Sequence, residues 1–430
     1  MSAEHHSRKR FFLAFLLFVL SAISFLDRTN ISIAGLQISS EYGLGNQHLG
    51  WIFSAFLIGY AGFQVPAGWL ASRFGPRLVI ALGVVWWGVA TALTTLIPVG
   101  ISQAVLLLIG IRFALGAGEA VIYPAANQFV ARWVPEQERG LINGLIFAGV
   151  GAGSGLTPPL LAWFILHHGW RSAFWFSAII GVVAGAVWWW FARDTPEEDP
   201  KVSPAELRTI REGIAETGAS PDSDSSLPVV ISWSAILRRR DLLALILSYF
   251  GFGYTAWIFF SWFFLYMAQV RGFNLKASAM FSMLPFLSMT VGCLGGGALS
   301  DRLTRTYGLR VGRCGLAAVA YLFTAVFLVL GSRVQSPQLA GVILAGGAGA
   351  LYVSQSSFWS VSADIAGRSS GVFSSMVNMG AQIGGAVTAS LTPWVAQRFG
   401  WTTSFAIAAA LAVVGAGLWM TVHPERPLSA

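Results

Sequence analysis

Long apolar runs repeat along the chain, and short polar segments separate them. A helix needs roughly 20 apolar residues to cross a hydrocarbon layer about 30 Å thick. Runs of that length recur twelve times, at 11–35, 49–71, 77–97, 103–129, 140–164, 171–192, 241–269, 277–299, 311–331, 338–361, 369–393 and 401–422. The pattern therefore predicts an all-α membrane protein with twelve transmembrane helices.

The spans fall into two sets of six. Between residues 194 and 240 the sequence becomes acidic and rich in Pro and Ser, with a helical pattern near Ala205–Ala215. We interpret 194–240 as a cytoplasmic linker between an N-terminal six-helix half, residues 1–193, and a C-terminal six-helix half, residues 241–430.

The two halves carry matching landmarks at nearly one offset. These are Gly68–Arg73 with Gly297–Arg302 and Arg139 with Arg368, both 229 residues apart, and Gly169–Phe174 with Gly400–Phe405, 231 apart. Because each half has an even number of spans, the repeats are parallel. Parallel repeats imply a pseudo-two-fold axis along the membrane normal and a site between the halves near the midplane.

Charge sets the orientation. Of the 430 residues, 55% are hydrophobic and 11% are charged, far below the quarter that is usual in soluble proteins. The net charge of +8 comes from basic residues in alternate loops, which does not call for a nucleic-acid partner. The opposite loops hold only Arg171, Arg271, Lys276, Arg333 and Arg398. This bias places both termini in the cytoplasm of a cell membrane, which we expect to be a bacterial inner membrane. A cleaved signal peptide at 11–35 would leave an odd number of spans.

Four charged residues lie well inside the predicted spans, away from their ends. Asp27 and Glu119 are the acidic residues placed well within them, and Arg28 and Arg112 are the basic ones. A charge among lipid tails costs several kcal/mol, so such residues face a protein interior or a watery cavity. Burial favours the neutral acid and a nearby arginine favours the charged form, so these carboxyl groups are candidates for proton coupling. The alternatives are static ion pairs between helices or, for Asp27 and Arg28, capping in water.

Arg112 and Glu119 are seven residues apart, which places them within about 20° on one helix face and about 10 Å apart along it. They line one stripe, with Gly116 between them and Tyr123 one turn beyond, but they cannot touch. Asp27 is then the nearest candidate partner for Arg112. Because guanidinium groups suit carboxylate recognition, the buried arginines indicate an anionic substrate.

Polar and aromatic residues also recur at helical spacing within other spans. The faces are Tyr60 with Gln64, Tyr254 with Trp257 and Ser261, Tyr352 with Ser356 and Trp359, and Ser374 with Asn378 and Gln382. Hydroxyl, amide and aromatic groups around a cavity suit a polyhydroxylated acid. Ordinary helix packing or anchoring at the membrane interface is the alternative for each.

Motifs for catalysis are absent. The sequence has no His-Glu-x-x-His zinc motif, no nucleotide loop and no nucleophile elbow, so we expect neither an enzyme nor a bound metal or cofactor. The glycine-rich run 149–155 lies within a span and lacks a following Lys. We interpret it as small residues that let helices pack closely. Cys293 and Cys314 indicate neither a metal site nor a disulfide.

Several of these segments resemble a known family. The run Arg112–Ala120 in the fourth span and the glycine-rich loop after the second span, with its echo after the eighth, resemble the major facilitator superfamily. More narrowly, residues 27–32, 123–125 and 132–139 resemble the anion:cation symporter family. That family includes bacterial sugar-acid/H⁺ symporters and the lysosomal sialic acid exporter.

The resemblance implies alternating access and specific roles. It implies that Arg28 contacts the substrate carboxylate, that Glu119 takes up the proton, and that Asp27 pairs with Arg112 as a switch. Tyr60, Trp359 and Asn378 match substrate-binding positions, and Tyr254 and Ser356 are further candidates. Arg73, Asp301 and Arg302 belong to the gating loops, where the chain has Ser72 in place of the usual acid.

The sequence therefore predicts a monomeric transporter that takes up an organic anion together with protons. The expected substrate is a sugar acid: an aldonate, a uronate or an aldarate. Uptake of an aromatic or other carboxylic acid, anion efflux or exchange, and a receptor that binds without transporting remain as alternatives.

Overall fold

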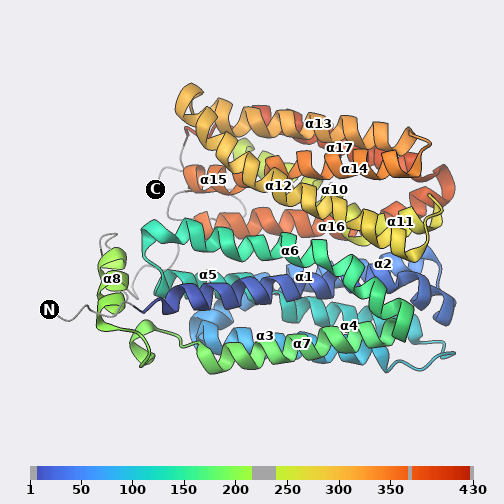
Figure 1. Ribbon diagram of the computed structural model, residues 1–430. Helices are drawn as coiled ribbons and strands as arrows, with labels where there is room; N and C mark the ends of the chain where they lie inside the picture. Colours follow the sequence, from blue (N-terminus) through green and yellow to red (C-terminus); the bar gives the residue numbers. More distant parts are fainter. Residues whose placement is uncertain (1–6, 216–238, 367–369, 427–430) are drawn as a thin grey trace.

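The computed structural model describes residues 7–215, 239–366 and 370–426, and this part of the chain is built from helices without strands. Two groups of roughly parallel helices make up the bundle (Figure 1). The first contains α1 (Lys9–Tyr42), α2 (Asn46–Phe74), α3 (Pro76–Thr95), α4 (Ala104–Glu119), α5 (Ile122–Trp133), α6 (Glu136–His168) and α7 (Trp170–Phe191). The second contains α10 (Arg240–Ser261), α11 (Phe263–Gln269), α12 (Leu275–Tyr307), α13 (Leu316–Arg333), α14 (Pro337–Val353), α15 (Gln355–Ala366), α16 (Ser370–Phe399) and α17 (Trp401–Thr421).

The predicted all-α membrane class is confirmed. Within the described residues, eleven helical segments are long and apolar enough to cross a membrane. The eleventh predicted span, 369–393, coincides with α16, which is not among these segments. This helix carries Asn378, Gln382, Thr388 and Thr392, and it packs against α2 and α10. Polar side chains are tolerated there because other helices cover much of α16.

Several spans differ in detail from the predicted ranges. The fourth is α4 and α5 with a break at Ala120 and Val121, and α14 and α15 break at Ser354. The helices also extend beyond the apolar runs. The run that begins at 11 was expected to end at 35, but α1 continues to Tyr42 and ends at Gly43, whose φ is 67°. The length of an apolar run corresponds to the part of the helix within the hydrocarbon layer. The helix itself continues into the headgroup layer and ends at a residue that favours left-handed backbone.

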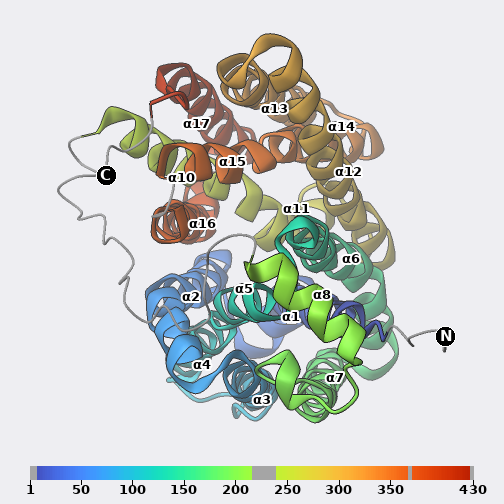
Figure 2. The same ribbon diagram turned by 90° about the vertical axis from the view of Figure 1, so that its left-hand side faces the viewer.

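Glycines set the contact between the two groups, in which α2 packs against α16 and α6 against α12 (Figure 2). A Cβ atom at Gly50 would lie 2.5 Å from the Ala389 carbonyl oxygen, and one at Gly151 would lie 2.0 Å from the Thr290 hydroxyl oxygen. On the same helix, Gly149 and Gly153 approach α1 just as closely. The interpretation of run 149–155 as a packing surface is confirmed.

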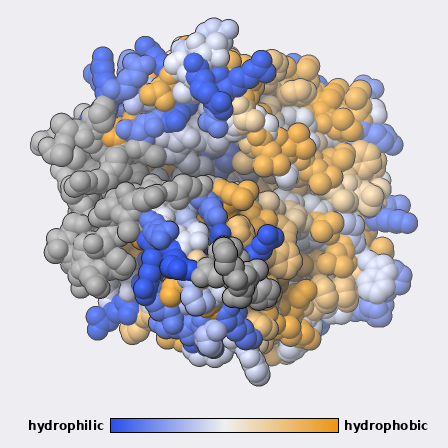
Figure 3. All heavy atoms as spheres, turned by 60° about the vertical axis from the view of Figure 1, so that its left-hand side comes forward, coloured by the Kyte–Doolittle hydropathy of each residue, from blue (hydrophilic) through white to orange (hydrophobic). Residues whose placement is uncertain are grey.

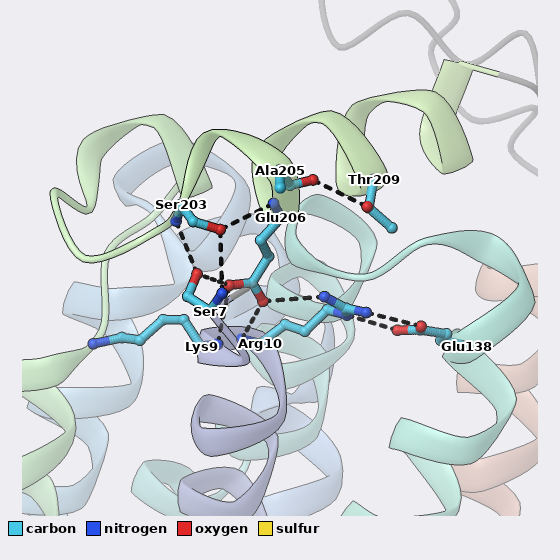
Figure 4. A network of polar contacts seen from close by, with 8 residues as sticks. All are labelled: Ser7, Lys9, Arg10, Glu138, Ser203, Ala205, Glu206 and Thr209. Atoms are coloured by element: carbon cyan, nitrogen blue, oxygen red, sulfur yellow. Dashed lines mark hydrogen bonds and ion pairs between the residues drawn. The ribbon is translucent and has the colours of Figure 1, made fainter. Parts of the chain in front are cut away.

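The linker contains a short helix docked on the first group. This helix, α8 (Pro204–Ala215), matches the predicted helical pattern at Ala205–Ala215 and lies beside the start of α1 (Figure 4). We call this end of the bundle the terminal end. The remainder of the predicted linker, 216–238, and the repeat landmark Arg368 lie outside the described residues.

A buried carboxylate fastens α8 to α1. Glu206 is 1% exposed and accepts hydrogen bonds from the backbone N–H groups of Lys9 at 3.1 Å and Arg10 at 3.2 Å, and from the Ser7 hydroxyl. The Arg10 guanidinium bridges Glu206 at 3.1 Å and Glu138 of α6 at 2.7 Å (Figure 4). The negative charge thus sits at the N-terminus of α1, where the helix dipole favours it.

We predict that Glu206→Gln destabilises this end of the protein by about 3 kcal/mol, because one buried member of an ion pair loses its charge. The amide NH₂ would also oppose backbone donors. The melting midpoint of the purified protein should fall by several degrees. Glu212→Gln, on an exposed position of the same helix, is the control and should leave the midpoint unchanged. Equal midpoints for both variants would contradict the assignment.

Candidate substrate site

The four charged residues predicted within the spans are all buried in the first group of helices. Asp27 and Glu119 are 0% exposed, Arg112 is 2% exposed and Arg28 is 5% exposed. Asp27 and Arg28 lie midway along α1, and Arg112 and Glu119 lie on α4. Their burial matches the prediction and excludes capping of an outer helix end in water.

Glycines bring α2 and α4 together beside these charges. A Cβ atom at Gly116 would lie 2.0 Å from the Phe56 carbonyl oxygen, and one at Gly59 would lie 2.2 Å from the Phe113 carbonyl oxygen. Because only glycine permits this distance, the Phe56 and Tyr60 rings of α2 come within reach of the arginines. Gly116 therefore gives room to a neighbouring backbone.

Arg28 and Glu119 form the central ion pair. The Arg28 Nε atom donates to Glu119 Oε2 at 2.7 Å, and the Ser24 hydroxyl donates to the same oxygen at 2.9 Å. The Arg28 guanidinium also lies over the rings of Phe25, at 4.4 Å from the centroid, and Tyr60, at 4.5 Å. Charge-assisted hydrogen bonds in a low-dielectric site are strong, and the nearby rings add cation–π attraction.

Asp27 and Arg112 are arranged differently from the expectation. Asp27 Oδ1 accepts from the Thr91 hydroxyl at 3.3 Å and from the Asn30 amide at 3.4 Å. The Arg112 guanidinium lies 5.0 Å from the Phe56 ring centroid. Asp27 and Arg112 interact electrostatically, but the salt bridges found among the described residues include none between them. The expected direct pair is therefore absent from this conformation, where Glu119 instead holds the neighbouring arginine.

Several polar atoms of this cluster have no hydrogen-bond partner within the described protein. They are Asp27 Oδ2, Glu119 Oε1, Arg28 Nη2, Arg112 Nε and Arg112 Nη1. Buried polar atoms are almost always paired, because an unpaired one costs a few kcal/mol. Both donors and acceptors are in excess, so the cluster has the capacity to bind a small polar molecule or a proton.

The second group contributes predicted residues with different surroundings. Asn378 of α16 donates to Gln64 of α2 at 3.2 Å and so joins the two groups. Tyr254 is 1% exposed and packs toward Thr388 and Thr392 of α16, within its own group. Its hydroxyl has no hydrogen-bond partner in the described protein, and its assignment as a substrate-binding residue stays a prediction.

Ser356 and Trp359 lie on α15. Ser356 packs near Gly297 of α12, and its buried hydroxyl has no hydrogen-bond partner in the described protein. The Trp359 ring contacts Tyr249 edge-on, with the centroids 5.9 Å apart. Both are partly buried, so they remain candidates for contact with a substrate.

Sequence reasoning missed several residues of the site. Tyr249 and Gln355 hydrogen-bond each other, with the amide nitrogen 2.9 Å from the hydroxyl. Thr91 gave no signal because it is one of three threonines near the end of its span. Ser24 could have been found, since it lies four residues before Arg28 and therefore on the same face of α1.

The two groups meet closely on the side away from the terminal end. Aromatic pairs connect Phe25 with Phe260, Phe53 with Trp262, and Phe56 with Trp257, at centroid distances of 5.7, 5.3 and 6.3 Å. At the same side Ser54 donates to the Ala386 carbonyl at 2.6 Å. The surface toward the terminal end is hollowed between the groups (Figure 3).

The predicted gating loops lie at the terminal end. Arg73, Asp301 and Arg302 are exposed. Ser72, which replaces an acid, accepts a hydrogen bond from Gln128 at 2.8 Å and donates to the Gly68 carbonyl at 3.0 Å. Ser72 and Gly68 lie in the last turns of α2, so the predicted loop residue is helical here and makes only neutral contacts.

Within the described ranges, no three His, Cys, Asp or Glu side chains are grouped as metal ligands would be. The thiols of Cys293 and Cys314 are free.

The chain is similar in sequence to proteins named as transporters. The chain is 32% identical over 406 residues to the probable sulfoacetate transporter SauU of Cupriavidus necator, covering 94% of this chain and 91% of that protein. It is 26% identical to the D-galactonate transporter of Escherichia coli, covering 97% and 96%.

A solved structure shows the same fold. The bacterial homolog of the human lysosomal transporter Spinster, in an inward-facing and unoccupied conformation, matches with a TM-score of 0.75 at 18% identity and covers 97% of each chain. The sequence model of the Major Facilitator Superfamily matches residues 17–378. The chain therefore belongs to the Major Facilitator Superfamily and is a multi-pass membrane transporter, not an enzyme.

Proposed function

We propose that the protein takes up an organic anion together with protons. The observation that carries this proposal is the Arg28–Glu119 ion pair, buried beside polar atoms that the protein leaves unpaired. Arg28 can pair with Glu119 or with a substrate carboxylate. Protonation of Glu119 weakens the first pairing and frees Arg28 for the second.

Charge balance supplies the coupling. The cluster of Asp27, Arg28, Arg112 and Glu119 carries two negative and two positive charges, which sum to zero when all four are ionised. An anion that entered alone would leave one uncompensated buried charge, at a cost of several kcal/mol. A proton on Glu119 restores the balance. A monoanion therefore requires one proton, and a dianion would require protons on both Glu119 and Asp27.

A sugar acid fits the surrounding side chains. Two guanidinium groups suit a carboxylate, while Tyr60, Asn378 and the Tyr249–Gln355 pair offer hydroxyl and amide groups for a hydroxylated chain. The relatives named for sulfoacetate and D-galactonate both carry anions by name, which supports this substrate class.

Alternating access would proceed by rocking of residues 1–193 against 241–430, with 194–240 as the linker. The contacts gathered away from the terminal end, and the hollow toward it, support assignment of this conformation as open toward the termini. We place the termini in the cytoplasm of a bacterial inner membrane, on the charge bias of the loops. Arg73, Asp301 and Arg302 would then close that side in the opposite conformation. Both sides of the site come from one chain, which supports a monomer.

We predict that Glu119→Gln separates exchange from accumulation. The amide mimics the protonated acid, so the variant should exchange substrate across proteoliposome membranes at a near-native rate but lose accumulation driven by a proton gradient. Glu41→Gln, at an ion pair with Arg171 far along α1, is the control and should accumulate normally. Normal accumulation by Glu119→Gln would show that Glu119 is not the coupling residue, whereas native transport that is the same with and without a pH gradient would favour proton-independent exchange or efflux.

The ion pair itself predicts non-additive stability. Arg28→Met leaves the Glu119 carboxylate buried without its partner, which should cost about 3–5 kcal/mol. Adding Glu119→Gln to Arg28→Met should recover part of that loss, with a coupling of about 0.5–3 kcal/mol. Melting midpoints of the two single variants and the double variant measure the cycle. Additive shifts would show that the two residues do not interact.

A thermal-shift screen should identify the substrate class. Aldonates, uronates or aldarates should raise the melting midpoint of the purified protein, because ligands that bind only the folded state stabilise it. The corresponding neutral sugars should have no effect, and Arg28→Lys should abolish the shift by the acids. A shift by benzoate derivatives alone would indicate an aromatic acid as the substrate.

A further inference from the structure

A row of hydroxyl groups leads from Glu119 toward the terminal end. The Ser24 hydroxyl donates to Glu119 Oε2 at 2.9 Å, and the Ser21 hydroxyl lies 2.9 Å from the Tyr123 hydroxyl. Ser21 and Ser24 are both 0% exposed. The hydroxyl groups of Ser21 and Tyr123 take no part in the Arg28–Glu119 ion pair.

The direction of this row follows from the helices that carry it. Ser21 precedes Ser24 by three residues on α1, which begins at the terminal end. Tyr123 follows Glu119 by four residues, and its helix α5 continues toward the same end. Each spacing is about one helical turn, or 5.4 Å. The Ser21–Tyr123 contact therefore lies one turn closer to the terminal end than the Ser24–Glu119 contact.

Helix α6 encloses the row. A Cβ atom at Gly149 would lie 2.5 Å from the Phe18 carbonyl oxygen and 2.9 Å from Ser21 Cβ, so α6 and α1 touch beside Ser21. The Phe147 ring stacks on Tyr123, with centroids 5.2 Å apart and planes 5° from parallel. The hydroxyls thus form a polar line along an apolar wall.

Ordinary packing does not require this arrangement. A buried serine in a helix commonly donates to the carbonyl one turn earlier, as Ser177 does to Ala173 at 2.9 Å. Ser21 instead pairs with a hydroxyl on another helix, and Ser24 with a carboxylate. Side chains at i and i+3 have Cβ atoms about 5–6 Å apart, so Ser21 and Ser24 are neighbours that a hydroxyl contact or one water molecule spans.

We propose that Ser24, Ser21 and Tyr123 relay the proton between Glu119 and the water at the terminal end. This inference rests on the proposed proton coupling at Glu119. Protonated Glu119 gives its proton to Ser24, each hydroxyl accepts one proton and passes one on, and Tyr123 releases one to water. The hydroxyls end unchanged and Glu119 ends as a carboxylate that pairs with Arg28. Arg112 and Asp27 are the other charged groups that act on Glu119.

The test compares proton-driven uptake with exchange in proteoliposomes. Tyr123→Phe keeps the ring stack on Phe147 and removes only the hydroxyl, and Ser21→Ala removes its partner. Each variant should slow proton-driven uptake about tenfold or more. This factor is smaller than the roughly 100-fold or greater rate gain that a positioned proton-transfer group typically provides. Exchange without a proton gradient should stay near the native rate, because Glu119 can stay protonated throughout. Ser21→Thr retains a hydroxyl and should restore uptake.

Tyr321→Phe is the matched control. This tyrosine is 0% exposed and donates to the Ser248 carbonyl at 2.9 Å within the second group, so the variant loses a buried hydrogen bond away from Glu119. Its uptake should match native. Unchanged uptake by Tyr123→Phe and Ser21→Ala, or an equal loss of exchange, would overturn the relay. If proton coupling itself is absent, uptake by the native protein will not depend on the proton gradient. That result differs from failure of the relay alone, in which native uptake still depends on the gradient.

Discussion

The structure depends on keeping ionised groups balanced in a place where water cannot screen them. Arg28 and Glu119 meet at 2.7 Å in the interior of a bundle that spans the membrane. Neither charge would persist there alone, since the desolvation of one buried ion costs several kcal/mol. The need for charge balance that stabilises the pair also makes the pair sensitive to added charge. Any second anion or any proton changes the balance, and the remaining charges must rearrange.

Helix packing places the pair inside the first group, beside rings that contact the second group. Glycines at 59 and 116 bring α2 against α4, so that the rings of Phe56 and Tyr60 cover the arginines. Aromatic contacts such as Phe53 with Trp262 close one side of the bundle. These contacts are apolar and carry no fixed charge, so they can separate at modest cost. A site that is closed on one side and hollowed on the other suits access from one side at a time.

The sequence was informative where the membrane restricts which residue types a span can contain. Buried charges at 27, 28, 112 and 119 follow from composition alone, because a membrane span rarely carries them without a use. Long apolar runs predicted the helices, and the internal repeat predicted two groups. The apolar run at 369–393 also predicted helix α16, although α16 is not among the helices whose length and mean hydropathy mark them as candidate membrane spans.

Pairing could not be predicted, because it depends on how helices rotate against each other. Periodicity placed Asp27 and Arg112 near one another but could not show that Glu119 takes Arg28 in this conformation. Tyr254 lies toward Thr388 and Thr392 of α16, a contact that its place on a polar helical face could not show. Tyr249 and Gln355 are far apart in sequence and become partners only through packing.

The most direct test of the account is proton movement that accompanies the substrate itself. Adding a sugar acid to lightly buffered, energy-depleted vesicles that contain the protein should raise the external pH as protons enter with the anion. The account predicts this alkalinisation for the native protein and none for Glu119→Gln. Transport of the acid without any change in external pH, or the same change in both proteins, would contradict it.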